Sequence, residues 1–150
     1  MLPPTPATWA LVLVGMVFLF PVITYVQIKV ITAPRSRKTE ALWMGKGGRW
    51  RDETQVEYAI GTAWADLISW LPMSVAGSIG SLLGHPWGYG LLIGSGTIAV
   101  YINTIYWFSE RKYLLPIRGA LAYYTYEWGA WMVWGIVVVI YAAFRLGMMN

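Results

Sequence analysis

Cysteine is missing from this 150-residue sequence, and histidine occurs once, at His85. Without cysteine the chain forms no disulfides and offers no thiolate for Fe–S clusters or for cysteine-based zinc sites. One histidine also excludes a haem held by two histidines of the same chain. Because His85 has no second metal ligand near it in a Gly/Pro-rich turn, we expect neither a bound metal nor a cofactor.

Charged residues are scarce as well, at 12% of the chain against 57% hydrophobic residues. A soluble domain carries about 25% charged residues, so much of this surface must face something other than water. Ten tryptophans and ten tyrosines agree with this, because amphipathic rings gather at membrane–water interfaces. The composition predicts a single-domain, multi-pass protein of the cell (inner or plasma) membrane.

Four long apolar stretches organise the chain. Each has at least the ~20 residues that a helix needs to cross a ~30 Å hydrocarbon core, and none alternates polar and apolar residues as a half-buried strand does. We therefore predict an all-α, four-helix transmembrane bundle in which Pro21 and Pro72 kink two of the helices. The predicted helices cover about residues 8–31, 56–83, 88–109 and 118–144.

Basic residues gather in two of the predicted connections. The connection from Lys29 to Arg51 holds seven of them, and the short connection from Glu110 to Arg118 holds three more. With four crossings both connections lie on the same side, which the positive-inside rule identifies as cytoplasmic. Both termini are then outside. The basic, tryptophan-containing loop 35–51 is expected to lie against anionic lipid headgroups, so the net charge of +4 indicates a membrane partner and no nucleic acid.

Two acidic residues, Asp66 and Glu127, fall inside the predicted second and fourth helices. Each lies nine positions past a charged residue at the cytoplasmic boundary, which places it roughly 13 Å along its helix. An ionised carboxylate at such a depth costs at least ~2.5–3.5 kcal/mol. It therefore faces the bundle interior, finds a partner or stays protonated, and it is a candidate functional residue.

Helical periodicity assigns a different stripe to each acid. The Asp66 stripe consists mostly of small residues, which mark close helix–helix contact in membranes. The Glu127 stripe is aromatic, and it either lines a pocket for an amine or flat apolar ligand or only fills the core. Asn103, on the third helix, falls at a similar depth. The candidate ligand-binding residues are Asp66, Glu127, Asn103, Tyr123, Trp131, Trp134 and Trp70.

Two further patterns extend this polar layer. Gln27, near the inner end of the first helix, is predicted to join it together with tyrosines that include Tyr25 and Tyr106. The third helix carries two faces of small residues, which predict a neighbouring helix on each side. One face holds Gly90, Gly94 and Thr97 and continues to Tyr101; the other holds Gly96 and Ala99 and continues to Asn103.

Three functions remain open at this point. The first is the binding or movement of a small ligand, cation or proton at Asp66 and Glu127, which for a path of only four helices favours a homo-oligomer. The second is an accessory or scaffold subunit of a larger membrane complex. The third is an intramembrane enzyme in which one acid donates a proton to a lipophilic substrate while the other acts as a base.

Overall fold

A computed structural model of the chain describes residues 2–119, 121 and 128–148. Within these residues every regular element is a helix, which confirms the predicted all-α class. The elements, with η denoting a π-helical turn, are α1 (Pro6–Leu13), η1 (Val14–Leu19), α2 (Phe20–Thr32), α3 (Arg37–Met44), α4 (Glu53–Ala65), η2 (Asp66–Trp70), α5 (Leu71–Leu82), α6 (Pro86–Arg118) and α8 (Trp128–Gly147).

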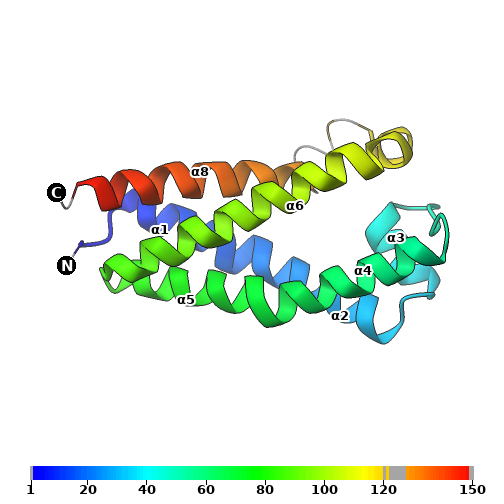
Figure 1. The fold of residues 1–150 in the computed structure, drawn as a ribbon, viewed down its shortest axis with the longest axis horizontal. Coiled ribbons are helices and arrows are strands. Elements are labelled where there is room, and N and C mark those ends of the chain that lie inside the picture. Colours follow the sequence, from blue (N-terminus) through cyan, green and yellow to red (C-terminus); the bar gives the residue numbers. More distant parts are fainter. Residues whose placement is uncertain (1, 120, 122–127, 149–150) are drawn as a thin grey trace.

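The long helical segments lie side by side along one axis (Figure 1). α1, η1 and α2 follow one another without a break, as do α4, η2 and α5. Both chain ends and the turn before α6 lie at one end of the molecule, whereas α3 and the start of α4 lie at the other. α6 packs along α8 and α5, and α2 packs against α4. The two basic segments therefore share one end, as the predicted orientation requires.

Three of the helical segments are long and apolar enough to cross a membrane: Pro6–Thr32, Pro86–Tyr113 and Gly129–Gly147. The segment Glu53–Leu82 is long enough but less hydrophobic, because it carries Asp66, two glutamates and many glycine, serine and threonine residues. Its crossing, and with it the four-span topology, stays a prediction.

Each predicted proline kink coincides with a π-helical turn. η1 ends just before Phe20 and Pro21, and η2 ends just before Leu71 and Pro72. A proline has no N–H to offer the carbonyl four residues back, and the chain adapts by bonding across five residues: Phe20 N–H donates to the Gly15 carbonyl, and Leu71 N–H donates to the Asp66 carbonyl. Asp66 thus opens a π-turn, a feature frequent at functional sites.

The third helix is longer than predicted. α6 continues to Arg118, so the stretch Glu110–Arg118, predicted as a connection, is helical. The prediction placed Glu110 at the aqueous boundary, but its side chain is buried at 5% exposure, which keeps the helix in contact with the rest of the chain. Gly119, at φ 79°, ends α6 in a conformation that glycine adopts readily. α8 is described from Trp128 onward.

The segment 35–51 differs from the surface loop predicted for it. Ser36 caps α3 by accepting a hydrogen bond from the Thr39 backbone N–H. Trp43 and Met44, at the end of α3, are 2% and 3% exposed and pack into a core cluster with Tyr106. These apolar side chains are therefore inserted between helices, where burial stabilises them. The nearby basic side chains remain exposed, namely Arg35, Arg37 and Lys38.

Asp52 caps the N-terminus of α4. Its Oδ1 accepts from the Gln55 backbone N–H at 2.9 Å, and its Oδ2 accepts from Arg51 Nε at 2.9 Å. The backbone hydrogen bond from Gln55 and, after it, the bond from Arg51 hold the pKa of the Asp52 carboxyl below its usual value. Because the pKa of Asp52 is lower in the folded than in the unfolded protein, the ionised carboxylate stabilises the folded state at a pH above the unfolded-state pKa. This stabilisation is lost as the pH falls through the folded-state pKa.

Replacing Asp52 by alanine is therefore expected to lower the melting temperature slightly at neutral pH. The melting curves of variant and parent should converge in acid, once the Asp52 carboxyl of the folded parent is protonated. Asp52→Asn is the matched control, because it keeps a capping oxygen but does not titrate. A difference between Asp52→Ala and the parent that is the same at every pH would contradict this account.

Candidate functional site

A small cavity between α2, η2, α6 and α8 gathers four of the predicted site residues. Its volume is about 30 Å³, which is room for about two water molecules. Asp66, Trp70, Asn103 and Trp131 all line it. The full lining comprises Ile23, Asp66, Trp70, Ile98, Ala99, Ile102, Asn103, Tyr106 and Trp131. Residues that are far apart in sequence thus meet around one space.

The Asp66 carboxylate is half-buried and is held by a side chain from the neighbouring helix. Gln27 Nε2, on α2, donates to Asp66 Oδ2 at 2.5 Å, and the Gln27 side chain is fully buried. This contact bears out the predicted place of Gln27 in the polar layer. Tyr25, predicted for the same layer, is instead 41% exposed, because it lies on another face of α2. One amide therefore fixes the carboxylate from the α2 side.

Asn103 approaches the cavity from α6 and is only 5% exposed. Its Nδ2 donates to the Ala99 carbonyl at 2.7 Å. Its Oδ1 has no hydrogen-bond donor within the described residues, and the same is true of Oε1 of the buried Gln27. Buried polar atoms in native proteins nearly always have partners. Asn103 and Asp66 thus line the cavity together with Tyr106, whose hydroxyl can donate or accept.

Two tryptophans form an aromatic wall. Trp70 Nε1 donates to the Ser95 carbonyl at 2.9 Å, so the Trp70 N–H is already used. The Trp131 ring meets Trp70 edge to face, with centroids 5.9 Å apart. Trp134, also predicted for the site, packs against Phe20 and Trp70. It lines a different cavity of about 10 Å³, so Trp134 does not border the Asp66 cavity.

Glu127 and Tyr123, the other predicted site residues, lie outside the described residues. Later members of the predicted aromatic stripe lie on α8 and can be compared with the prediction. Trp131, Trp134 and Val138 are 8%, 5% and 1% exposed, so this face of α8 is turned toward the interior as predicted. The prediction that Glu127 and Tyr123 belong to the ligand-binding site stays a prediction.

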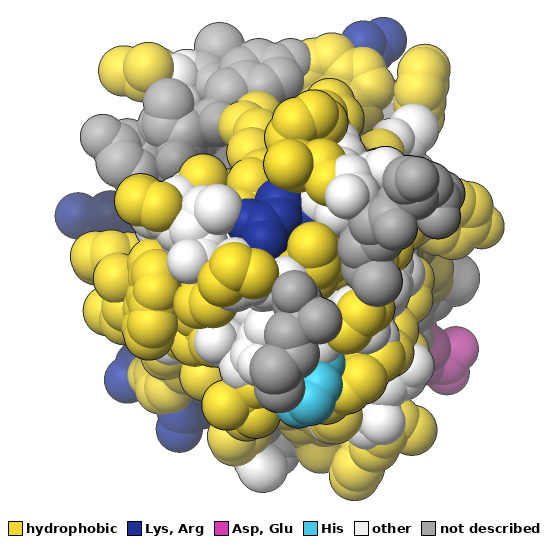
Figure 2. Space-filling model, turned by 90° about the vertical axis from the view of Figure 1, so that its left-hand side faces the viewer, with side chains coloured by type: hydrophobic (Ala, Val, Ile, Leu, Met, Phe, Trp, Pro, Cys, Tyr) yellow, Lys and Arg dark blue, Asp and Glu magenta, His cyan; other side chains and the backbone are white. Residues whose placement is uncertain are grey.

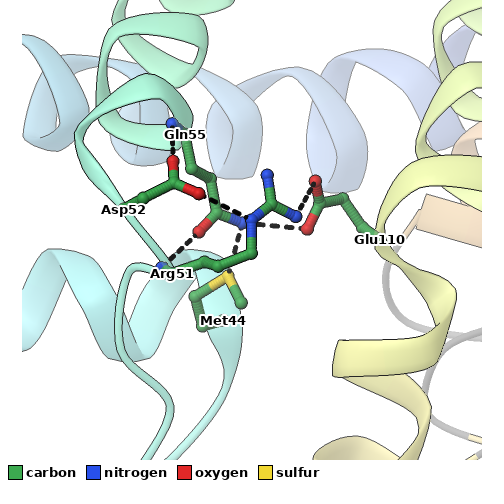
Figure 3. Close-up of polar contacts among 5 residues, drawn as sticks. All are labelled: Met44, Arg51, Asp52, Gln55 and Glu110. Carbon is green, nitrogen blue, oxygen red and sulfur yellow. Dashed lines mark hydrogen bonds and ion pairs between the residues drawn. The ribbon is translucent and has the colours of Figure 1, made fainter.

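A second polar cluster, which sequence reasoning missed, joins α6 to the start of α4 (Figure 3). Gln55 Nε2 donates to Glu110 Oε2 at 2.8 Å, and Arg51 Nη1 lies 3.6 Å from Glu110 Oε1. Gln55 Oε1 also accepts from the Arg51 backbone N–H at 2.7 Å. Helical spacing could have revealed the cluster, because Asn103, Tyr106 and Glu110 share one face of α6. This cluster anchors the helix that carries Asn103.

Arg145 occupies the opposite end of the molecule, where both termini lie. Figure 2 shows basic atoms at the centre of that face, surrounded by hydrophobic and uncharged side chains. Arg145 is 5% exposed, its Nη2 donates to the Pro3 carbonyl at 2.7 Å, and its guanidinium lies 5.3 Å from the Tyr89 ring centroid. Arg145 thus fastens the N-terminal segment to α8 without an acidic partner among residues 2–119, 121 and 128–148.

The described part of the chain contains no group of three or more His, Asp or Glu side chains that could hold a metal ion. His85 instead stacks on Trp87, with ring centroids 5.8 Å apart. The Asp66 cavity is therefore the strongest candidate site on geometric grounds. Comparisons with protein families, curated proteins and solved structures find no match to this chain.

Proposed function

We propose that this is a four-span membrane protein, with both termini outside, that binds a proton or small cation at Asp66. The observation that carries the proposal is the convergence of Asp66, Asn103, Trp70 and Trp131 on one cavity. The sequence predicts all four as site residues, and they come from three separate helical segments. A carboxylate with amide oxygens beside it is suited to a positively charged occupant.

The size of the cavity supports a small occupant. Pockets for drug-sized ligands measure roughly 300–1,000 Å³, whereas this cavity measures about 30 Å³. Anions are disfavoured, because the Asp66 carboxylate lines the cavity. A proton carried by water, or a cation of similar size, fits these constraints better than a bulky amine.

Movement of such an occupant across the membrane requires a path that continues beyond the cavity. Four helices are few for that purpose, so we propose that any transport occurs in a homo-oligomer. In the proposed orientation, the exposed basic side chains of segment 35–51 lie in the cytoplasm and contact anionic headgroups. The proposed site itself lies within one chain.

Dicyclohexylcarbodiimide tests the site directly, since it modifies carboxylic acids in apolar surroundings. In vesicles we expect the reagent to label the parent protein at Asp66. An excess of a small monovalent cation, or a rise in pH, should slow this labelling. The Asp66→Asn variant should keep the parent's elution volume and melting behaviour but lose this labelling and any proton flux measured with an internal pH dye. Glu57→Gln, an exposed acid on the same helical segment, is the matched control and should behave like the parent. Equal proton flux in Asp66→Asn and parent, or undiminished labelling of the variant, would contradict the proposal.

One observation favours a second candidate, an accessory subunit. The Gln27–Asp66 hydrogen bond joins α2 to the segment that contains η2, and such bonds hold membrane helices together by themselves. In that case Asp66→Asn reduces folded yield and leaves no separate activity to lose. Purification in a gentle detergent separates the two candidates, because a lone 16.9 kDa chain or self-oligomer opposes the accessory role.

A further inference from the structure

An open apolar groove runs between the first and second helical segments. Its volume is about 950 Å³, and it is distinct from the Asp66 cavity. One wall extends from Met16 to Ile28 and the other from Leu67 to Ile79, so each wall is roughly 18 Å long at 1.5 Å per residue. The lining residues are Met16, Phe20, Pro21, Thr24, Tyr25, Ile28, Leu67, Leu71, Pro72, Val75, Ala76 and Ile79.

The two π-turns and their prolines shape this groove. Phe20 and Pro21 line it on one side, and Leu71 and Pro72 line it on the other. Thr24 brings a hydroxyl group to the middle of this wall, and this group donates to the Phe20 carbonyl at 2.6 Å. The wall therefore offers a long apolar surface whose threonine is already satisfied. Inside a bilayer, such a surface is suited to a hydrocarbon chain.

Two lysines stand at one end of the groove. Tyr25 and Ile28 line that end, and Lys29 Nζ and Lys38 Nζ lie 5.9 and 5.7 Å from the Tyr25 ring centroid. The hydrogen bond to the Tyr25 hydroxyl raises the pKa of Lys38 above its usual value, so its ammonium stays charged. Within the described residues neither lysine forms an ion pair with an acidic side chain. A positive headgroup site thus adjoins the apolar groove.

We propose that the groove binds an anionic glycerophospholipid, with one acyl chain along the groove and the phosphate between Lys29 and Lys38. Lysine side chains at helix ends extend toward the headgroup region while their stems stay in apolar surroundings. Charge complementarity identifies the occupant: a second copy of the chain would bring the same two lysines and repel, whereas an anionic lipid supplies both the chain and the charge. This site is separate from the cation site proposed above.

Native mass spectrometry with defined lipids tests the proposal. The probes are phosphatidylglycerol and phosphatidylcholine with identical acyl chains, added to the full-length protein in detergent. We expect phosphatidylglycerol to bind more tightly than phosphatidylcholine. Each of the substitutions Lys29→Gln and Lys38→Gln should weaken the binding of phosphatidylglycerol roughly fivefold, which corresponds to the attraction of one lysine to an anionic lipid surface. Binding of the two lipids with equal affinity would overturn the proposal.

A matched control separates this site from general surface charge. Lys46→Gln with Arg49→Gln removes two exposed basic residues from the same connection and should leave the preference unchanged. An equal loss in this control variant overturns the specific site. Excess inorganic phosphate should not displace the lipid, because it lacks the acyl chain; displacement would show that the lysines bind phosphate alone.

The groove itself is tested by filling it. Ala76 lines the groove and is half-buried, so Ala76→Trp should weaken phosphatidylglycerol and phosphatidylcholine binding alike, while both lysines remain. Because the chain has no cysteine, Ala76→Cys provides a single crosslinking position, and efficient disulfide formation between two copies would assign the groove to a second chain instead. Asp66→Asn should leave lipid binding unchanged, so failure of the lipid site and failure of the cation site give different results.

Discussion

Replacing Gly88 by alanine is expected to force α6 away from α5 and to destabilise the folded protein by about 3 kcal/mol or more. An added Cβ at this position lies 2.2 Å from the Ser81 nitrogen and 2.3 Å from the Gly80 carbonyl carbon. Both are backbone atoms of α5, which cannot turn aside as the tip of a flexible side chain can. The helices must separate, and they lose the close approach on which small-residue packing in membranes depends.

Thermal unfolding in detergent, followed by helical circular dichroism and elution volume, measures this effect. Gly90→Ala is the matched control on the same helix, because a Cβ there meets no atom within 4 Å. It should be neutral or slightly stabilising, since alanine favours helix over glycine. If the Gly88→Ala and Gly90→Ala variants have the same melting temperature, the close approach of α5 to α6 is not as described.

The Gly88 contact shows what a small-residue stripe can and cannot predict. The stripe of small residues that contains Asp66 is predicted to pack against another helix. Gly77 and Gly80 belong to this stripe by helical spacing, and both lie against α6. The second small face of α6 also packs: a Cβ at Gly96 would lie 2.7 Å from the Gly135 carbonyl oxygen. Small residues thus identify surfaces able to pack closely.

The prediction for the other small face of α6 holds only in part. A Cβ at Gly94 would lie 3.3 Å from Met73 Sδ of α5. Gly90 and Thr97 are exposed, and Tyr101 on the same face is 66% exposed. The sequence alone does not decide between two equally small faces, because the choice depends on where the short turn before α6 directs the helix. That turn brings α6 back along α5, and α8 then covers the Gly96 face, whereas the other face meets α5 at Gly94.

The site was predictable where depth and helical periodicity sufficed. Both place Asp66 and Asn103 at similar levels, and the cavity contains both. Prediction failed for the contacts between the second half of α6 and the segment that ends at the start of α4. Trp43 looked like an interfacial residue in a loop, but α3 folds back and buries it against Tyr106. Glu110, which the sequence places at the end of the predicted third helix, also has its partners there: Arg51 just before α4 and Gln55 at its start.

Removing the Glu110 carboxylate is the second large effect that we expect. Glu110→Ala should cost about 3 kcal/mol, because the buried Gln55 amide loses a charged acceptor and has no solvent to replace it. Arg51 contributes less, since its side chain is 37% exposed and its ion pair at 3.6 Å is screened by water. Glu110→Gln keeps the shape and one acceptor, so its loss of stability should be clearly smaller.

A double-mutant cycle attributes the effect to the contact itself. Replacing Gln55 and Glu110 together by leucine leaves neither polar group buried alone, so the double variant should be more stable than the sum of the single losses implies. Additive losses would mean that the two side chains act separately. Because Glu110 lies on the face of α6 that also carries Asn103 and Tyr106, loosening this end should also disturb the cavity wall. We therefore expect Glu110→Ala, but not Glu110→Gln, to change the rate at which dicyclohexylcarbodiimide modifies Asp66, and this couples the anchor of α6 to the proposed site.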